Sequence, residues 1–584
     1  MTDLEREAFA GSLRLPVVNG QPRIWWLLDV EWGGGILRMA ADDLDIEKAD
    51  GTIIRYNAGL DGEISLSETL PLSGDASGQL STGIEVLLPV NVPQLVQQGH
   101  DLAAARSVLS RWIEGTTWEQ RRVVLLGRLV DPVYDDEDAP VRAQLEEVAW
   151  TDLGWTHALT QRVDGVTWAH ADTLDPVGLG VPYPLIFGTP YYVTIGTGAY
   201  AVSGSPGLWI DRRFLNAGAD FPDALAEVRI LVAGHHCAAT AIRLLTDDYP
   251  TGEAFIVRNG YDALGQPVCF VPWFDTSTPA GAPDDDWDFP TYSYNGYNSG
   301  LGEPTANVAI LDAAVQATVY AAWYSLGGLS PLCGDVLGYL LPLTSLPVDA
   351  GRLQAVSGAL GRYRIDCAIT ERVSPWDWIR DNLLPILPIA VVSGPRGLYP
   401  LLIRYAATAA DAVAVLDVDV DTDIEPVDGI SINGKDRANR IKLNYAYDYA
   451  SGEYAASVTL TGDSADILRD VATGDGPANI RTDPRCIAAR VAQGRVVDIE
   501  ISSAVIYEDS TAWAVVADQA ALRCEVRRDA VYNVPEGRYP QIERGSVVII
   551  RESRRYVANV ALVMDATTRG DGYVGLTLWL RGAA

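Results

Sequence analysis

The sequence predicts a mainly β (α+β), multi-domain protein in which antiparallel β-barrels are accompanied by short helices. Three observations support this. A chain of 584 residues is too long to fold around one hydrophobic core. Strand-favouring Val, Ile, Thr, Tyr and Trp are abundant, whereas long segments with helical periodicity are few. The 54 Gly and 33 Pro residues are spread along the chain, as expected for many short strands joined by turns.

Strand and turn signals divide the chain into four predicted domains. Residues 1–151 are expected to form a first β-barrel, and residues 152–330 a less regular α+β domain. Residues 331–475 are expected to combine capped helices with strand hairpins, and residues 476–584 to form a β-barrel portion with one helix. Each segment has the length of an ordinary domain.

The first segment alternates short apolar runs with turns, a pattern typical of a small closed barrel. Leu102, Ala105, Leu109 and Trp112 keep near-helical spacing, which predicts one short helix between Leu95 and Trp112. The predicted strands are Arg23 to Trp32, Thr52 to Tyr56, Gly62 to Leu66, Gly83 to Val90, Arg121 to Leu129 and Val141 to Trp150.

The second segment carries the longest helical pattern of the chain. Apolar residues recur at helical spacing from Asn307 to Leu326, and Gly327 and Gly328 follow as a stop signal. Tyr183 to Val193 is interrupted by proline and glycine, so it is not expected to be a central strand throughout. Asp284 to Pro290 reads as an acidic, aromatic loop.

The stretch from Gly334 to Tyr405 has the clearest local signals of the chain and no catalytic motif. Ser374 and Pro375 form an N-cap and first-turn pair, and apolar residues at helical spacing follow. Ile389 to Val392 and Leu398 to Tyr405 are predicted to pair as strands around a turn at Gly394 to Gly397.

The last third of the chain reads mostly as strands. Val413 to Asp423 alternates strictly from Leu416, which predicts a strand with Asp417, Asp419, Asp421 and Asp423 on one face. Three further features are expected, namely a hairpin of Arg440 to Tyr449 with Tyr454 to Leu460, a helix from Asp509 or Ser510 to about Arg528, and three antiparallel strands at Ser546 to Arg551, Arg555 to Asp565 and Gly572 to Arg581.

Acidic residues outnumber basic ones by 77 to 44, for a formal net charge of −33. This balance argues against ordinary nucleic-acid binding, which requires Lys and Arg to neutralise phosphates. Two interpretations stay open. The charge is compatible with a surface that DNA passes without adhering, and equally with acidity that keeps a large protein soluble.

No catalytic, cofactor or metal site is predicted. The six cysteines are far apart and form no CxxC pair, so they read as buried thiols rather than zinc or iron–sulfur ligands. The acids from Asp417 to Asp428 fail the EF-hand pattern, with Thr422 where Gly is needed and Asp428 in place of Glu. A nucleophile pair at His235, His236 and Cys237 is disfavoured, because adjacent strand residues point to opposite faces.

Tyr and Trp are unusually frequent, with 26 Tyr and 16 Trp against 8 Phe. This bias suits interfaces, where an apolar ring and a polar tip are both useful, and it suits carbohydrate binding equally. The N-terminal residues lack the order of a signal peptide, and no apolar run approaches eighteen residues. We therefore expect synthesis in the cytoplasm and no stable membrane insertion.

Three passages, taken in order, resemble the baseplate hub (tail-tip) proteins of long-tailed bacteriophages and gene-transfer agents. Gly62 to Pro89 with Trp118 to Pro132 resembles the first tube-like barrel of such hubs. Tyr183 to Pro190 (YPLIFGTP) resembles their linker into the second domain. Gly334 to Tyr405, with Asn439 to Tyr454 and Thr511 to Arg581, resembles the hub core and its second tube-like barrel.

The resemblance implies a structural virion protein with no enzyme activity and no cofactor. It implies a homotrimer whose two barrels per subunit adapt a sixfold tail tube to a threefold tip, part of the channel for DNA ejection. The implied partners are the distal tail protein, the tape-measure protein, a central fibre or spike, and phage DNA in transit. The implied location is the tail tip of the virion, after assembly in the host bacterial cytoplasm.

Under this resemblance, Asp417, Asp419, Asp421 and Asp423 are candidates for a channel lining that repels DNA. The competing hypotheses are a carbohydrate-active or carbohydrate-binding tail protein that acts in host attachment, and a passive adhesin. Paired carboxylates for glycoside hydrolysis stay open, because a sequence does not give the separation between them.

Overall fold

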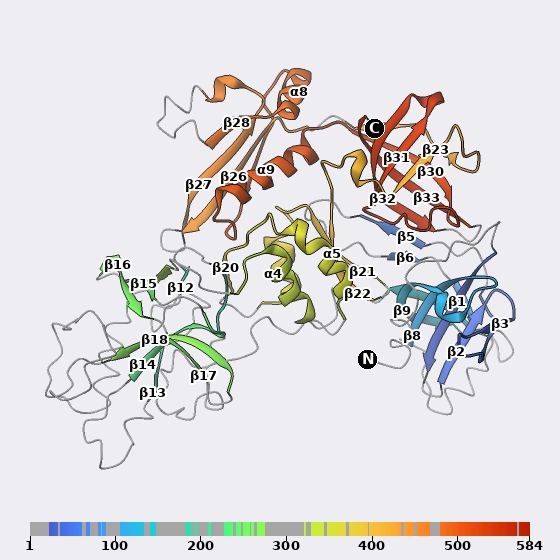
Figure 1. Ribbon diagram of the computed structural model, residues 1–584, viewed down its shortest axis with the longest axis horizontal. Coiled ribbons are helices and arrows are strands. Elements are labelled where there is room, and N and C mark those ends of the chain that lie inside the picture. Colours follow the sequence, from blue (N-terminus) through green and yellow to red (C-terminus); the bar gives the residue numbers. More distant parts are fainter. Residues whose placement is uncertain are drawn as a thin grey trace, which may run out of the picture.

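The computed structural model confirms a mainly β, multi-domain protein with a few short helices (Figure 1). The structure describes residues 23–32, 35–60, 66–70, 80–82, 85–88, 105–133, 141–147, 183–188, 193–194, 208–211, 227–237, 241–246, 249–256, 258–261, 265–274, 320–322, 329–343, 347–369, 373–394, 396–433, 437–448, 452–467, 479–568 and 572–583. The predicted loop at Asp284 to Pro290 lies outside these residues.

The N-terminal part is an eight-stranded sheet with the order β3-β4-β2-β1-β8-β9-β10-β7. All pairs are antiparallel except β2 with β4. Its strands are β1 (Ile24–Trp32), β2 (Gly35–Ala40), β3 (Leu44–Glu47), β4 (Ile53–Ala58), β7 (Glu85–Leu88), β8 (Arg106–Ile113), β9 (Arg122–Val133) and β10 (Val141–Glu147), with a 3-10 turn η1 at Trp118–Gln120.

The predicted helix between Leu95 and Trp112 is wrong over its C-terminal half, where the structure has strand β8. Seven consecutive residues of β8 are buried, because the strand lies between β1 and β9 in the middle of the sheet. A strand that is covered on both faces need not alternate between apolar and polar residues, so its apolar residues can match helical spacing by coincidence.

The middle of the chain contains three small antiparallel sheets. One pairs β11 (Leu185–Phe187) with β20 (Cys367–Ile369). The second has the order β12 (Val193–Thr194), β19 (Tyr320–Ala322), β15 (Ala241–Thr246), β16 (Tyr249–Ile256). The third has the order β13 (Leu208–Asp211), β14 (Glu227–Ala233), β18 (Pro267–Phe274), β17 (Arg258–Tyr261).

The helix predicted from Asn307 to Leu326 does not extend through residues 320–322, which form β19. The remaining residues of that prediction lie outside the described part of the chain. The interrupted character expected of Tyr183 to Val193 is confirmed where it is described, since β11 covers only three residues before Gly188.

Helices α4 (Cys333–Leu340), α5 (Ala350–Leu360) and α6 (Pro375–Asn382) occupy the centre of the molecule, with the 3-10 turn η5 (Leu341–Leu343) after α4. The predicted hairpin follows as β21 (Ile389–Gly394) and β22 (Gly397–Leu402). Residues from β11 to α9 contribute to one large hydrophobic core here, which includes Phe187, Leu337, Trp376 and Val515.

Beside this core lies a four-stranded sheet with two helices. The order is β28 (Ile480–Thr482), β27 (Glu453–Thr461), β26 (Arg440–Asp448), β29 (Asp498–Ser502), with β28 and β29 parallel to their neighbours. Helices α8 (Pro484–Gln493) and α9 (Asp509–Arg523) complete it. The predicted hairpin of Arg440 with Leu460 is confirmed in β26 and β27.

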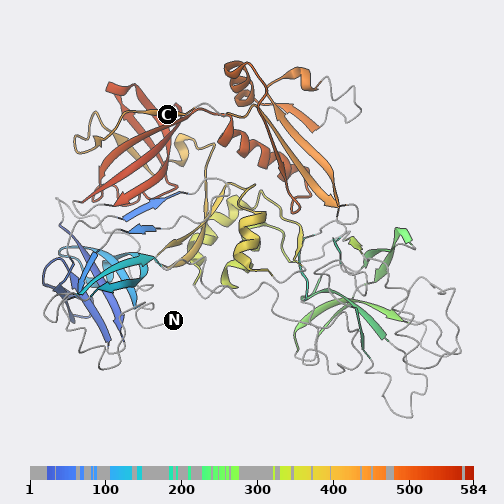
Figure 2. The same cartoon turned by 180° about the vertical axis from the view of Figure 1, so that it is seen from behind.

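The C-terminal part is a strongly curved sheet that wraps into a half-barrel (Figure 2). Its main order is β23-β31-β32-β33-β30-β24, and β25 also pairs with β30. Its strands are β23 (Ala414–Asp417), β24 (Glu425–Pro426), β25 (Ser431–Asn433), β30 (Arg527–Pro535), β31 (Val547–Glu552), β32 (Val557–Thr568) and β33 (Tyr573–Ala583), with 3-10 turns η6 (Ala409–Asp411) and η8 (Ser553–Arg555).

The three C-terminal strands predicted from the sequence are confirmed as β31, β32 and β33, and they are antiparallel. Helix α9 is also confirmed, but it ends at Arg523 rather than near Arg528, because β30 starts at Arg527.

The domain limits stay a prediction. The β26–β29 sheet takes strands from both sides of the expected limit at residue 475.

Candidate functional site

The strongest structural feature for function is the joint between the N-terminal sheet and the C-terminal half-barrel. Strands β5 (Leu66–Thr69) and β6 (Leu80–Thr82) come from the N-terminal part of the chain but pair as a hairpin onto β32. The register joins Thr69 to Asp565 and Leu66 to Thr568. Two strands from the N-terminal part of the chain therefore extend the half-barrel sheet, and Figure 1 shows them below β32.

Leu70, directly after β5, fixes the end of this hairpin. Its amide donates a 2.7 Å hydrogen bond to the Met564 carbonyl oxygen. Its side chain is buried in a cluster with Val392, Met564 and Trp579. Because this cluster also contains residues of β21, β22 and α9, the N-terminal hairpin, the β21–β22 hairpin, α9 and the half-barrel are packed together.

A buried ion pair forms a second connection. Arg111 of β8 and Glu536, which follows β30, are both almost fully buried and form an ion pair. Arg122 of β9 lies 3.9 Å from the other carboxylate oxygen of Glu536. The Arg111 guanidinium also lies over the Trp26 ring at 4.9 Å. One carboxylate of the half-barrel is thus surrounded by two arginines of the N-terminal sheet.

A buried ion pair is weak support for stability in itself, because desolvation offsets much of the Coulomb attraction. The Arg111–Glu536 pair instead fixes how the two sheets are oriented. A buried charge that loses its partner is strongly destabilising, so the Glu536 carboxylate restricts how the two sheets can sit against each other. These residues are far apart in the chain and carry no sequence signal that would pair them.

The structure corrects the prediction for Asp417, Asp419, Asp421 and Asp423. Strand β23 ends at Asp417, and residues 418–423 form turns after it, so the four acids do not share one strand face. The turn is closed by a 2.8 Å hydrogen bond from the Asp421 amide to the Asp417 carbonyl oxygen. Alternation of Asp and Val did not distinguish a strand from this turn.

Each of the four acids has a partner within the half-barrel. Asp417 lies 3.9 Å from Arg551. Asp419 accepts hydrogen bonds of 2.6 and 2.9 Å from the side chain and amide of Ser553, which lower its pKa. Arg538 contacts Asp421 at 2.5 Å and Asp423 at 2.7 Å. This local pairing removes part of the negative charge that a bare acidic strand would present.

Burial alone would raise the pKa of Asp421, but hydrogen bonds from Arg538, the Asp423 amide and Tyr539 outweigh it and hold the pKa below its ordinary value. The Asp421 carboxylate is therefore charged at neutral pH and already bound to protein donors. Within the described residues, no group of three or more His, Cys, Asp or Glu side chains is arranged to hold a metal ion.

His235 and Cys237 do meet, contrary to the expectation from strand geometry. The Cys237 Sγ lies 3.8 Å from His235 Nδ1, because both residues follow the end of β14. His235 Nε2 accepts a 3.1 Å hydrogen bond from the Ile186 amide, and burial lowers the pKa of the imidazole. A hydrogen bond with Cys269, together with burial, raises the pKa of the Cys237 thiol.

The Cys237 thiol is protonated, and the neutral His235 imidazole beside it already accepts a hydrogen bond from the Ile186 amide. Such a thiol is not an activated nucleophile. All six cysteines are buried free thiols, as the sequence predicted. The sulfur atoms of Cys486 and Cys524 lie 3.5 Å apart.

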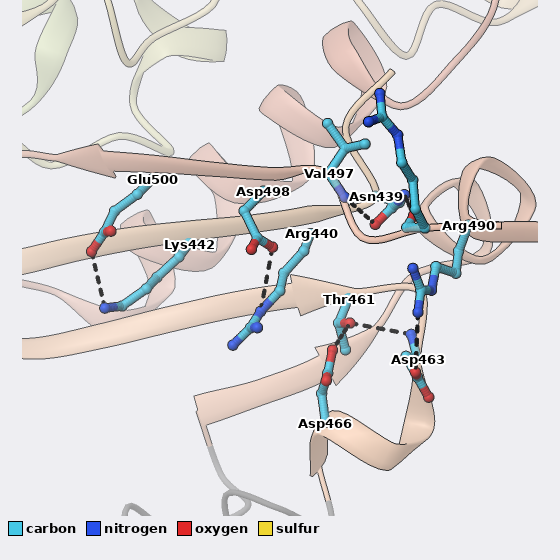
Figure 3. Close-up of polar contacts among 11 residues, drawn as sticks. Asn439, Arg440, Lys442, Thr461, Asp463, Asp466, Arg490, Val497, Asp498 and Glu500 are labelled. Carbon is cyan, nitrogen blue, oxygen red and sulfur yellow. Dashed lines mark hydrogen bonds and ion pairs between the residues drawn. The ribbon is translucent and has the colours of Figure 1, made fainter. Parts of the chain in front are cut away.

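The β26–β29 sheet presents one polar face, shown in Figure 3. Its parallel register places Arg440 opposite Asp498 and Lys442 opposite Glu500. The side chains of these two pairs lie 3.8 and 3.0 Å apart. The alternate residues Ile441 and Leu443 are buried in the central core, so the sheet has one charged face and one packed face.

Asn439 and Thr461 order the ends of this sheet (Figure 3). The Asn439 side chain accepts a 3.1 Å hydrogen bond from the Val497 amide and donates one of 2.8 Å to the Arg495 carbonyl oxygen. The Thr461 hydroxyl donates to Asp466 at 2.5 Å and accepts from the Asp463 amide at 3.1 Å. These bonds fix the turn between α8 and β29 and the turn after β27.

The aromatic residues of the described chain are mostly core residues. Among the largest side chains, Trp25, Trp118, Trp376, Tyr405 and Trp579 are all buried. Only a few aromatic rings are exposed, with Tyr556 the most exposed at 97%. Frequent Tyr and Trp therefore reflect packing in the described residues more than a displayed binding surface.

No protein-family model matches this chain, and no curated protein matches it. Solved structures with similarity include the 43 kDa tail protein of prophage MuSo2 from Shewanella oneidensis, with 10% identity, 95% of this chain and 98% of that chain covered, and a TM-score of 0.31. A tail protein from Neisseria meningitidis has 7% identity, coverage of 96% and 97%, and a TM-score of 0.32.

A chain of a native gene transfer agent particle has 14% identity, with 47% of this chain and 94% of that chain covered and a TM-score of 0.18. At these TM-scores the superposed backbones differ over much of their length. In the described residues, no helix is both long and apolar enough to cross a bilayer.

Proposed function

We propose that this chain is a structural virion protein, the trimeric baseplate hub that closes the distal end of a phage tail tube. In this role it adapts a sixfold tube to a threefold tip and forms part of the DNA-ejection channel. The proposal rests on the ordered resemblance of the sequence to such hubs. Its main structural support is the joint between the N-terminal sheet and the C-terminal half-barrel.

The joint matters because a subunit that supplies two units to one ring must hold them at a fixed angle. The β5–β6 hairpin pairs with β32 of the half-barrel and contacts β10 of the N-terminal sheet, and the Glu536 ion pair joins the same two sheets at a second place. A single flexible linker would leave the relative orientation of the two sheets undefined. Two connections of different kinds, one by backbone pairing and one by buried charge, make it specific.

The proposed partners are the distal tail protein above, the tape-measure protein inside, a central fibre or spike below, and DNA only in transit. A channel lining by Asp417, Asp419, Asp421 and Asp423 is also part of the proposal. Their partners are Ser553, Arg538 and Arg551. Repulsion of DNA would then depend on the remaining acidic excess within about 8 Å of the channel at physiological salt.

Sedimentation analysis of the purified chain tests the proposal. We expect a species of about three times the 63.0 kDa chain mass, with threefold symmetry in electron micrographs, that binds the neighbouring distal tail protein. A chain that stays monomeric at all concentrations and does not bind the distal tail protein would contradict the proposal that it is a hub. Release of soluble sugars from host envelope would instead favour the carbohydrate-active alternative.

A further inference from the structure

Helix α8 carries an apolar stripe on its outer side, opposite the side packed in the core. Cys486 and Ala489 face the core and are fully buried. Ile487 and Val491, four residues apart on the other side, are exposed, and Val491 has 79% of its surface accessible. Val496, in the turn after the helix, is also exposed. A helix with apolar residues on both sides is typical of one that is covered on both sides.

Basic residues flank this stripe. Residues 479–497 contain Arg481, Arg485, Arg490 and Arg495 against the single acid Asp483, a net charge of +3. The whole chain has a net charge of −33. Arg481 and Arg495 are exposed, while Arg490 is partly exposed beside Asp463 (Figure 3). An acidic partner with an apolar centre would match this surface.

A surface of that kind occurs elsewhere on the same chain, at the edge of the N-terminal sheet. Residues 41–55 contain Asp42, Asp43, Asp45, Glu47 and Asp50 against Lys48 and Arg55, a net charge of −3. Strand β3 is the outermost strand of the sheet, and Asp45 and Glu47 are exposed on it. Ile53, directly opposite Glu47 on β4, is 66% exposed, so an apolar residue lies among the acids.

These two surfaces cannot meet within one chain. Helix α8 and strand β3 lie on opposite sides of the molecule in both Figure 1 and Figure 2. Two complementary patches at separate places on one chain form a heterologous contact, in which the first patch of each copy binds the second patch of the next. Such contacts close into a ring when the rotation between copies is suitable, as a trimer requires.

We propose that the outer side of α8 binds the β3–β4 edge of a second copy of this chain. In the contact, Ile487, Val491 and Val496 pack against Ile53, while Arg481, Arg490 and Arg495 face Asp45, Glu47 and Asp50. The inference rests on the proposed trimer and assigns one of its interfaces. It also explains how copies with a net charge of −33 associate, since each contact brings a basic patch against an acidic one.

The first test replaces Val491 with aspartate and follows self-association over a concentration series by sedimentation. We expect the trimer of Val491→Asp to dissociate at concentrations about tenfold higher than the natural chain or more. Val420→Asp is the matched control, because Val420 is also a valine with 79% of its surface exposed and lies on the half-barrel instead. Circular dichroism confirms that both variants fold.

The second test exchanges charges across the proposed contact. Arg495→Glu and Glu47→Arg should each weaken the trimer, and the double variant should recover part of the loss, since the pair is restored with opposite polarity. If the double variant is only as weak as the sum of the two single variants, the two residues do not face each other and the inference is overturned.

The third test uses cross-linking between copies. A Val491→Cys chain is mixed with an Ile53→Cys chain and treated with a short bismaleimide, while the six native thiols are buried. We expect a covalent dimer containing one chain of each kind. A trimer that forms normally, gives no mixed product and is unchanged by Val491→Asp contradicts this interface but leaves the hub intact. A strict monomer contradicts both.

Discussion

At the scale of single residues, Glu536 has the most consequential position in the described chain. It extends from the half-barrel into a region where Arg111 and Arg122 of the N-terminal sheet are both within ion-pair distance. Both Arg111 and Glu536 are shielded from water. Their attraction is therefore much less screened by salt than that of a surface pair.

Replacing Glu536 with glutamine should destabilise the joint by about 3 kcal/mol, because two arginines would keep their charge after losing the carboxylate. Urea unfolding followed by tryptophan fluorescence would measure this, since Trp26 lies beside Arg111. Glu425→Gln, on the exposed strand β24, is the control and should change stability by less than about 0.5 kcal/mol. Equal effects of the two variants would contradict the importance of the joint.

The acid sensitivity of the turn after β23 is a second prediction at this scale. The folded-state pKa of Asp421 lies below its ordinary value of 3.8. The stabilisation of the folded state by the ionised Asp421 carboxylate is therefore complete above pH 3.8. It is lost as the pH falls through the folded-state pKa. The natural chain and the Asp421→Asn variant should differ in melting temperature at neutral pH, and their melting temperatures should converge below pH 3.8. A difference that grows on acidification would contradict the pairing with Arg538.

At the scale of elements, two helix starts that look alike in the sequence differ in the structure. Both α6 and α8 begin with proline after a capping residue, Ser374 and Asp483 respectively. The Asp483 carboxylate accepts a 2.8 Å hydrogen bond from the Arg485 amide. Ser374 has the extended backbone of an N-cap but makes no side-chain hydrogen bond to the helix.

Alanine substitution should separate these two helix starts. Asp483→Ala should cost about 1 kcal/mol, the usual value of a lost cap, whereas Ser374→Ala should cost at most a few tenths. Thermal unfolding of the two variants beside the natural chain provides the comparison. If Ser374→Ala proves as costly as Asp483→Ala, the hydroxyl of Ser374 has a role that the structure does not give it.

The turn of the β21–β22 hairpin depends on Gly397. Its φ of +117° is unfavourable for other residues, and a Cβ atom there would lie 1.9 Å from the Pro347 carbonyl oxygen. Gly397→Ala should therefore cost about 2 kcal/mol or more. Gly429→Ala, at a position with open space and ordinary φ, is the control, and hydrogen exchange of β21 and β22 would show whether the damage is local.

Local sequence signals predicted those elements whose neighbours in the chain are also their neighbours in space. The β21–β22 and β26–β27 hairpins and the strands β31 to β33 are of this kind. Helix α9 was also predicted, although its end was placed too late because β30 was not recognised.

The failures occurred where tertiary context decides the structure. The sequence predicts the end of a helix where strand β8 lies, because burial on both faces removes the alternation that marks a strand. The acids after Asp417 alternate like a strand, yet their hydrogen bonds to Ser553 and Arg538 stabilise a turn. The Arg111–Glu536 pair joins residues more than four hundred positions apart, which no local pattern encodes.

At the scale of the whole molecule, the described residues form several sheets, and specific contacts hold a number of them together. The β5–β6 hairpin extends the half-barrel, Leu70 enters its hydrophobic cluster, and α9 packs on both the β26–β29 sheet and the central helices. This organisation favours a protein whose function is to hold a shape within an assembly. The absence of enzyme activity stays a prediction.

The central claim is that this chain assembles as a ring of three subunits. Sedimentation equilibrium over a wide concentration range tests it most directly, because it reports mass without assumptions about shape. The account predicts a species of about three times 63.0 kDa that weakens in Val491→Asp and persists in Val420→Asp. A chain that sediments as a monomer throughout the range would contradict the account.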